Sequence, residues 1–430
     1  MTARADSPTP AGFLSRYRVL DLTDERGLLA GAMFGRLGAH VIQVEPPGGS
    51  SARQVPPFSN NVGPLEHSAH SSLFWSAYAS GKRGITCSLD SAAGRALVQR
   101  LAASADVVFE SFGAAIHPDL RYEALRELNP RLIHVTISAF GSDGPKSSYE
   151  DTELIAWAAA GPLWPHRDER GTPLRVSAPQ AYLHAAADAA SGAMLALLAR
   201  ERTGRGQHVD VSAQESASLA TMSATFATAV GHNNYSFDSP SLTEDPEDRG
   251  AHRRRSKWRA LDGWVQMHIG MGPTDGRFAN LLFNWIRREG ELPAGVADWD
   301  WIKLPELLRD GRVSQEQVEQ ARAAVAACLA RRTKREILDV AVSERILMAP
   351  ALTVAEVRES PHFNQRGLFE AVDENGVERT LPGRLAATSV PGHGVLKPAP
   401  LLGEHNQEIY LGLLGLAPEE LTQLEQEGVV

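Results

Sequence analysis

The sequence predicts an α/β fold in which a parallel sheet forms the larger part of the chain and a smaller second domain follows. Two observations predict this fold. Across the first 145 residues, short apolar segments alternate with helix-like segments, the order that joins parallel strands by right-handed crossovers. A polar stretch then separates them from a later group of strand-like and helix-like segments that begins at Trp258.

Each expected strand is a short apolar run bounded by turn residues. These runs cover residues 17–23, 40–45, 83–89, 106–112 and 131–141. Helices are expected where apolar residues recur at helical spacing, over 28–37, after an N-cap at Ser91, and over 122–129. The Ala-rich part that follows, 153–214, is expected to be helical up to a Thr-Gly-Arg-Gly-Gln turn and a short strand.

Changes in composition divide the chain into five parts. We expect a polar flexible tail at the N-terminus, a polar linker after the large domain, and a separate small domain after that linker. The boundaries are 1–12 for the tail, 13–215 for the large domain, 216–255 for the linker, 256–350 for the small domain and 351–430 for the last part.

Composition disfavours several classes of protein. Hydrophobic residues make up 43% and charged residues 22% of the 430 positions, as in ordinary globular proteins. The net charge of −9 disfavours nucleic-acid binding. Two cysteines, Cys87 and Cys328, indicate a reducing compartment rather than a disulfide framework. No stretch approaches the roughly 20 apolar residues of a membrane span, so we expect a cytoplasmic protein without membrane contact.

The usual nucleotide and metal motifs are missing from the sequence. Four glycines between residues 27 and 38 are spaced 4, 4 and 3 apart, which favours one packed helix face over a phosphate-binding turn. The segment SGKRG lacks the upstream glycine of a phosphate loop, and its Lys82 and Arg83 fit phosphate contacts and a solvated loop equally well. His67 and His70 lack further ligands, so no metal site is expected.

Two side chains have the chemistry of a nucleophile. Cys87 lies in an expected strand, which favours a packed structural thiol. Glu153 opens an apolar helix, where its carboxylate either only stabilises the helix N-terminus or is catalytic. The chain has no Gly-x-Ser-x-Gly motif, so hydrolase chemistry with a serine nucleophile has no support.

Six segments carry a resemblance to a known family. They are RVLDLT, RLGAHVIQVEPPGG, SGKRGITCSLDSAAGRALVQRLAASADVVFESF, YEALRELNPRLIHVTISAFGSDGP, LARERTGRGQHVDVSAQE and PAPLLGEHNQEIYLGLLGL. Together, and in this order, they resemble the family III CoA-transferases, the CaiB/BaiF-like group with formyl-CoA transferase and carnitine CoA-transferase. The resemblance implies a Rossmann-like large domain completed by residues 351–430, a small domain, and two chains interlocked as rings in a dimer.

The resemblance also implies an activity. Members of this family move CoA from an acyl-CoA donor to a free carboxylic acid, and an enzyme carboxylate attacks the donor thioester. Because the reaction retains the free energy of the thioester, it requires no ATP, metal or tightly bound cofactor. Coenzyme A and acyl-CoA are implied as substrates.

Several residues of this chain match functional positions of the family. The nucleophilic aspartate stands 21 residues before the threonine of the Thr-Gly-Arg-Gly-Gln turn, where this chain has Tyr182, and a phenol cannot form the acyl anhydride. Glu153 stands 29 residues before Tyr182, at a position where a supporting acid is usual. The usual Arg-Pro-Gly loop reads Gly-Ala-Ala at 113–115, and Asp90 replaces a usual lysine. The implied CoA-binding residues are Lys82, Arg83, Cys87, Leu89, Pro46 and Phe112.

Three functions stay open at this point. The first is a CoA-transferase with Glu153 as the replacement nucleophile; Asp188 is a weaker candidate, about 120° from the helix face of Tyr182. The second is a non-nucleophilic subunit that binds CoA esters or pairs with a paralogous chain in a heterodimer, in place of a homodimer. The third is a CoA-ester lyase or isomerase with Glu153 as general base. The bulk of Trp157, Trp164 and Tyr182 favours a bulky or aromatic acid as substrate over formate or oxalate.

Overall fold

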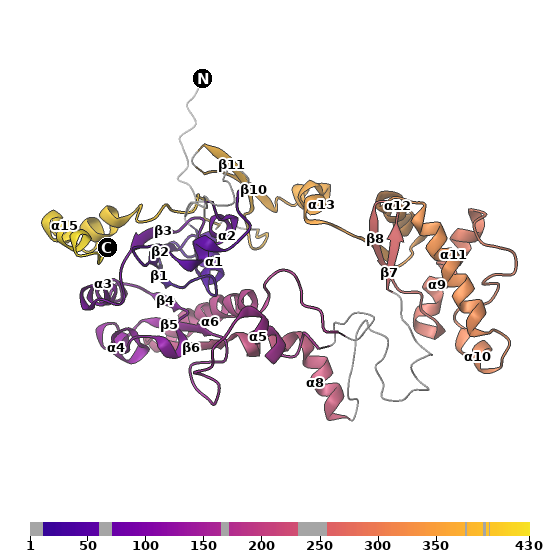
Figure 1. The fold of residues 1–430 in the computed structure, drawn as a ribbon, viewed down its shortest axis with the longest axis horizontal. Helices are drawn as coiled ribbons and strands as arrows, with labels where there is room; N and C mark the ends of the chain where they lie inside the picture. Colours follow the sequence, from indigo (N-terminus) through magenta and orange to yellow (C-terminus); the bar gives the residue numbers. More distant parts are fainter. Residues whose placement is uncertain are drawn as a thin grey trace, which may run out of the picture. The chain divides into compact units, whose positions relative to one another are not determined.

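Figure 1 shows a computed structural model of the chain. It describes residues 12–59, 71–164, 172–230, 256–374, 376–389, 393–394 and 396–430, so His67 and His70 lie outside the described residues. The chain forms two compact units, and the polypeptide leaves the first, builds the second and returns to the first. The first unit comprises Met1–Leu163, Arg175–Ser223 and Pro361–Val430, and the second comprises Trp164–Leu174 and Ala224–Ser360.

A six-stranded parallel sheet organises the first unit, in the order β3-β2-β1-β4-β5-β6. The α/β fold with a parallel sheet, predicted from the alternating segments, is confirmed. The chain builds outward from β1 to β3 in one direction and from β4 to β6 in the other, so the two halves part between β1 and β4. The strands are β1 Arg18–Leu22, β2 His40–Glu45, β3 Arg83–Thr86, β4 Val107–Glu110, β5 Ile133–Ser138 and β6 Gln207–Ser212.

Helices cover both faces of this sheet, because successive side chains of each buried strand point to opposite faces. Phe109 packs in the core formed with α1 and α6, whereas the preceding residue, Val108, packs in the core formed with α3 and α4. The helices of the first part of the chain are α1 Leu28–Arg36, α2 Leu73–Tyr78, α3 Ala92–Ala102, α4 Tyr122–Leu128, α5 Glu153–Ala159, α6 Ala181–Thr203, α7 Ala213–Ser218 and α8 Met222–Ala229.

Helix α6 corrects the expectation that no segment reaches the length and hydropathy of a membrane span. By length and composition its 23 residues pass that test, and half of the apolar window is buried inside the protein. Its buried positions are mostly alanines, which lie in one core with Val135 and Ile137 of β5. In this structure α6 is therefore the central helix on one face of the sheet.

The second unit contains an antiparallel sheet, β7-β8-β9, with helices whose core includes a stacked pair, Phe283 and Trp301, with ring centroids 4.6 Å apart. Its elements are β7 Lys257–Ala260, β8 Gly263–Met267, α9 Gly272–Arg288, α10 Leu304–Arg309, α11 Gln315–Ala330, α12 Lys334–Glu344, β9 Met348–Ala351 and α13 Val354–Glu359.

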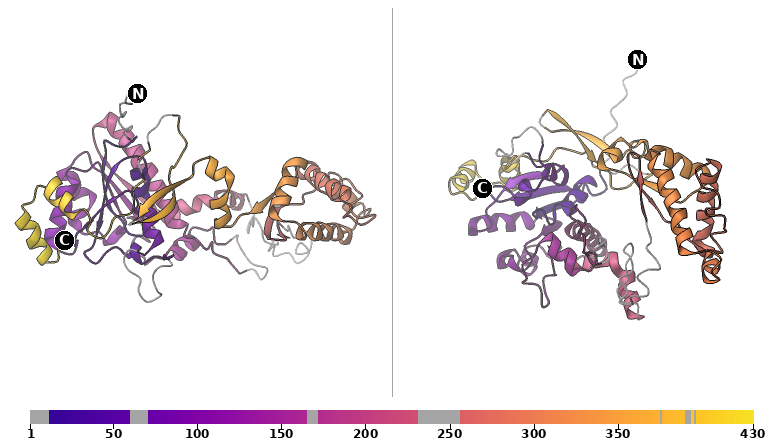
Figure 2. Two further views of the ribbon diagram at one scale, coloured as in Figure 1. Left: turned by 90° about the horizontal axis from the view of Figure 1, so that it is seen from above. Right: turned by 45° about the vertical axis from the view of Figure 1, so that its right-hand side comes forward.

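The C-terminal segment, drawn in yellow in Figure 2, shares one apolar core with α3 of the first unit. Tyr410 donates its hydroxyl proton to the carbonyl oxygen of Thr86 at 2.6 Å, which ties this segment to the end of β3. The last elements are α14 Pro361–Gln365, the hairpin β10 Phe369–Glu374 and β11 Val377–Pro382, the π-helical turn η6 Glu408–Leu413, and α15 Pro418–Gln426.

Candidate active site

A cavity of about 260 Å³, which we call the edge pocket, lies at the carboxyl ends of β1, β2 and β4. This is where the two halves of the sheet part. Doubly wound sheets bind ligands at this position, because the crossovers leave the strand ends in opposite directions and open a crevice. Its wall includes Thr23, Asp24 and Glu45.

Four of the six residues implied in CoA binding line the edge pocket: Pro46, Cys87, Leu89 and Phe112. They come from three separate parts of the chain, and parallel pairing brings them to one edge of the sheet. Burial raises the pKa of the Cys87 thiol to about 11, so the thiol stays protonated and donates to the carbonyl oxygen of Gly94 at 3.3 Å. Cys87 is therefore part of the wall, as a packed thiol.

Lys82, which the resemblance implies as a CoA-binding residue, is fully buried in this structure and does not line the edge pocket. Its buried Nζ donates to Asp21 Oδ2 at 2.7 Å, to the carbonyl oxygen of Leu28 at 2.9 Å and to Gln43 Oε1 at 2.9 Å. An ammonium group has three protons, so all are used inside the protein. A Cβ on Gly31 would lie 1.9 Å from Asp21 Oδ2, so this α1 glycine allows the helix to approach the ion pair.

Arg83 begins β3, away from the strand's carboxyl end at Thr86, and does not line the edge pocket. Its guanidinium pairs with Glu408 of the C-terminal segment at 2.7 Å, and this hydrogen bond lowers the pKa of Glu408. The two neighbouring cations therefore have separate positions, one in a buried ion pair and the other in a surface ion pair. The structure does not bring them together at the pocket.

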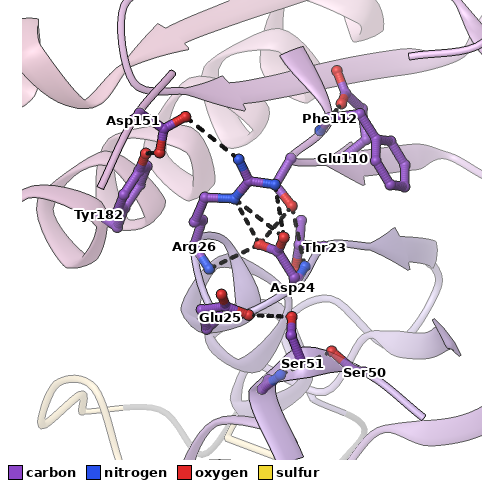
Figure 3. Close-up of polar contacts among 12 residues, drawn as sticks. Thr23, Asp24, Glu25, Arg26, Ser50, Ser51, Glu110, Phe112, Asp151 and Tyr182 are labelled. Atoms are coloured by element: carbon purple, nitrogen blue, oxygen red, sulfur yellow. Dashed lines mark hydrogen bonds and ion pairs between the residues drawn. The ribbon is translucent and has the colours of Figure 1, made fainter. Parts of the chain in front are cut away.

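Five polar side chains beside the edge pocket form a connected group, which we call the Arg26 cluster: Asp24, Arg26, Ser111, Asp151 and Tyr182. Figure 3 shows Asp24, Arg26, Asp151 and Tyr182 of this cluster. The guanidinium holds the Asp24 carboxylate in a fork, with Nε 3.0 Å from Oδ1 and Nη2 2.7 Å from Oδ2. The Ser111 hydroxyl donates to the same carboxylate at 3.0 Å. Because Asp24 also lines the edge pocket, the pocket and the cluster adjoin.

The other end of the Arg26 cluster combines a phenol with a second carboxylate. The Tyr182 hydroxyl donates to Asp151 Oδ1, and Asp151 Oδ2 lies 3.7 Å from Arg26 Nη1. Burial, together with the bond to Asp151, raises the pKa of Tyr182, so its phenol stays a proton donor. Burial by itself would lower the pKa of Arg26, but the hydrogen bonds with Asp24 raise it overall, so the cation persists.

Glu153 lies at the first turn of α5 and points to the N-terminus of α6. Its Oε1 accepts the backbone N–H groups of Gln180 at 2.5 Å and of Ala181 at 2.9 Å, and its Oε2 accepts that of Tyr182 at 3.2 Å. These are N–H groups that a helix leaves without partners inside itself. In this structure Glu153 therefore stabilises the N-terminus of α6, and among the described contacts it meets Tyr182, the other residue implied as catalytic, through the Tyr182 backbone N–H.

The model of CoA-transferase family III matches residues 14–406. This chain belongs to that family. The succinyl-CoA:(R)-benzylsuccinate CoA-transferase subunit BbsE of Thauera aromatica is 29% identical over 97% of this chain and 98% of its own length. The formyl-CoA:oxalate CoA-transferase of Streptomyces avermitilis is 28% identical over 97% and 99%. A CaiB/BaiF family protein from Brucella suis shares the fold, with a TM-score of 0.74 and 24% identity over 94% and 99%.

These relatives are named for CoA transfer between different acids, which supports CoA transfer as the general activity of this member of family III. Sequence reasoning missed Asp24, Arg26 and Asp151. The signal for Asp151 was its position two residues before Glu153, in the same acidic segment. The signal for Asp24 and Arg26 was their position directly after the first strand, because parallel sheets usually bind ligands at the carboxyl ends of their strands.

Metal ligands do not gather in the part of the chain that the structure describes. There, no group of three or more His, Cys, Asp and Glu side chains is arranged to hold a metal ion.

The buried carboxyl group of Glu110 is expected to make the stability of the fold depend on pH. Burial raises its pKa to about 7, and its Oε2 accepts the Phe112 N–H at 2.7 Å. Because the pKa is higher in the folded than in the unfolded chain, the stability from this group is fully present below about pH 4 and is lost as the pH rises through 7. Glu110→Gln is expected to remove that slope and to gain about 2 kcal/mol at pH 8, by urea unfolding. An unchanged slope would contradict the assignment.

Proposed function

We propose that this chain is a CoA-transferase whose edge pocket holds the nucleotide end of a CoA thioester, while the thioester reaches the Arg26 cluster. The observation that carries the proposal is the shared residue Asp24, which lines the pocket and is held in the fork of Arg26. Pro46, Leu89 and Phe112 supply apolar surface for a base and ribose in a pocket at the ligand-binding edge of the sheet.

The proposed reaction moves CoA from an acyl-CoA donor to a free carboxylic acid through carboxylate covalent catalysis. CoA passes from the donor acyl group to the enzyme carboxylate and then to the acceptor acyl group, so one thioester bond is present before and after the reaction and its free energy is retained. The substrates are coenzyme A esters and carboxylic acids. This transfer of CoA between acids is the general reaction that the relatives' names describe.

Removing the Phe112 ring tests the edge pocket. Phe112→Ala is expected to weaken the binding of succinyl-CoA about tenfold in titration calorimetry, because a stacked or packed aromatic ring contributes about 1–2 kcal/mol. Leu128→Ala is the matched control, since this exposed residue at the end of α4 is not part of the pocket wall. Equal affinities of the Phe112 variant and the natural chain would place the nucleotide elsewhere.

A second function is favoured by two specific observations. Tyr182 stands where the family pattern has the nucleophile, and both oxygens of Glu153 are used on the α6 backbone. These support a CoA-ester-binding subunit that works with a paralogous chain, and one relative is itself named as a subunit. Transfer activity of the purified chain alone supports the first function; activity that appears only after a paralogous chain is added supports the second.

The proposed assembly is an interlocked homodimer or a heterodimer with such a chain, in the cytoplasm. The acceptor we propose is an aromatic acid. Trp157 and Arg175 line a cavity of about 250 Å³ together with Glu153, so an aromatic ring and a carboxylate would both find a partner there. One relative is named for (R)-benzylsuccinate and another for oxalate. A screen in which small dicarboxylates outperform aromatic acids would remove this choice of acceptor.

A further inference from the structure

The geometry points to Asp151 as the carboxylate that carries the acyl group and then CoA. This inference rests on the proposed CoA-transferase function and names a residue for its covalent steps. Asp151 reaches the site from the loop before α5, whereas Tyr182 comes from the first turn of α6. Figure 3 shows the two side chains pointing toward one another, with Arg26 on the far side of the carboxylate.

The position of Asp151 compensates for the phenol at residue 182. A tyrosine side chain extends farther from the backbone than an aspartate, so the Tyr182 hydroxyl lies beyond the place where an aspartate carboxylate would end. At that hydroxyl the structure places the carboxylate of Asp151, which accepts its proton. A carboxylate therefore still stands next to the side chain of residue 182, and it contacts Arg26, which holds Asp24 of the edge pocket, but another segment of the chain supplies it.

The hydrogen bonds of the neighbouring carboxylates decide which of them is free to react. Both oxygens of Glu153 accept backbone N–H groups, three in all. Both oxygens of Asp24 are held in the Arg26 fork, and Ser111 binds one of them as well. Asp151 Oδ1 accepts from Tyr182, whereas within the described chain Oδ2 has an ion-pair contact at 3.7 Å and no closer partner.

Asp151 is also placed for contact with a substrate. Its side chain is 21% exposed, so a thioester can approach it, and its ion pair partner Arg26 is 27% exposed. A carboxylate that gives up few hydrogen bonds on reacting loses little stabilisation, which favours it as a nucleophile over a carboxylate that gives up three. The nearby guanidinium can stabilise the oxyanion of each tetrahedral intermediate.

The steps balance without a further reactant. Asp151 Oδ2 attacks the carbonyl carbon of the donor thioester, the C–S bond breaks, and CoA leaves as a thiolate, which gives a mixed anhydride of Asp151. The thiolate then attacks the Asp151 carbonyl carbon, the C–O bond of the anhydride breaks, and the donor acid leaves as its carboxylate. The acceptor carboxylate reverses these two steps on the Asp151–CoA thioester, which releases the acceptor's CoA ester and restores the Asp151 carboxylate.

Tyr182 is a positioning residue in this scheme. Its hydroxyl proton binds Oδ1 and so leaves Oδ2 as the attacking atom. Since it acts through Asp151, removing the hydroxyl should slow acylation more than it changes the binding of the CoA ester. Tyr182→Phe is therefore expected to lower kcat about tenfold with a nearly unchanged KM for the donor.

The test traps the covalent intermediate. The purified chain, in the oligomeric state in which it is isolated, is incubated with succinyl-CoA and then with borohydride or hydroxylamine, and its peptides are analysed by mass spectrometry. We expect the reduced or hydroxamate-bearing residue to be Asp151. Asp151→Asn is expected to lose the label and to lower transfer by about a thousandfold or more, as loss of a nucleophile does. Glu150→Gln, at the exposed neighbouring position, is the matched control and keeps the label.

Calorimetric binding of succinyl-CoA separates the possible failures. Binding without any label at Asp151, or with the label on Glu153 or another residue, overturns the role of Asp151 and leaves the proposed CoA-ester binding intact. No binding of succinyl-CoA, CoA or formyl-CoA overturns the proposed function itself and the role of Asp151 with it. Asp151→Asn also serves as a folding control, since a variant that binds the CoA ester with natural affinity but carries no label is folded.

Discussion

Substituting Lys82 by methionine is expected to lower the free energy of unfolding by about 3–5 kcal/mol, the usual effect of removing one partner of a buried ion pair. The substitution leaves the Asp21 carboxylate fully buried, and in the described part of the chain its other oxygen then keeps hydrogen bonds from Thr23 alone. It also leaves the Leu28 carbonyl oxygen and Gln43 Oε1 without the ammonium protons that they accept. Urea unfolding followed by circular dichroism measures the loss.

Two further variants make this result specific to the buried pair. Arg83→Met removes the neighbouring cation, whose partner Glu408 is about half exposed, and should cost less than about 1 kcal/mol. Adding Asp21→Asn to the Lys82 variant should recover part of the lost stability, because the unpaired charge is removed. If Lys82→Met unfolds like the Arg83 variant and instead weakens CoA binding, the role inferred from its hydrogen bonds is wrong and the sequence-based expectation is right.

Substituting Arg26 by methionine is expected to reduce transfer about a hundredfold. The Arg26 cluster then keeps two carboxylates, Asp24 and Asp151, without the cation that lies between them. Asp24 also loses both arms of the fork that hold it at the edge pocket, and charged hydrogen bonds of this kind contribute about 1.5–3 kcal/mol. Steady-state kinetics with succinyl-CoA as donor measures the effect.

Arg26→Lys separates charge from geometry in the same cluster. A lysine restores the positive charge but not the two-armed fork, so we expect it to recover only part of the lost rate. Full recovery would show that charge alone is needed, and an unchanged rate in Arg26→Met would exclude the cluster from the reaction. Binding of succinyl-CoA to both variants is the control that the edge pocket is still formed.

Much of the fold could be predicted from local patterns. The strands over 40–45 and 131–141 were visible because each is a short run rich in valine and isoleucine, which favour strands. The N-cap at Ser91 was visible because its hydroxyl and the following apolar spacing are local features, and its Oγ accepts the Gly94 N–H at 2.9 Å. Helix-face glycines predicted close packing, and Gly31 shows it against Asp21.

The candidate site could be predicted only in part. Phe112 and Pro46 were implied by the family resemblance. Each follows a strand, and because the carboxyl ends of parallel strands meet at one edge, both line the same pocket. Glu153 was found as an acid at a helix start, but its partners are backbone groups 27–29 residues away. A neighbouring carboxylate, Asp151, was missed, because a sequence does not tell which of two nearby acids faces a helix end and which faces a phenol.

What the sequence determined by itself is the architecture of the large unit and the family, since hydrophobic period and motif order are written along the chain. The tertiary structure alone decided which charged side chains are buried in ion pairs and which remain accessible to solvent. Lys82 and Arg83 are neighbours in the chain, yet Lys82 is buried in an ion pair with Asp21, whereas Arg83 forms a partly exposed ion pair with Glu408. Ionisable groups act through partners brought from distant segments, and burial sets the strength of each pair, so their chemistry follows from packing rather than from order along the chain.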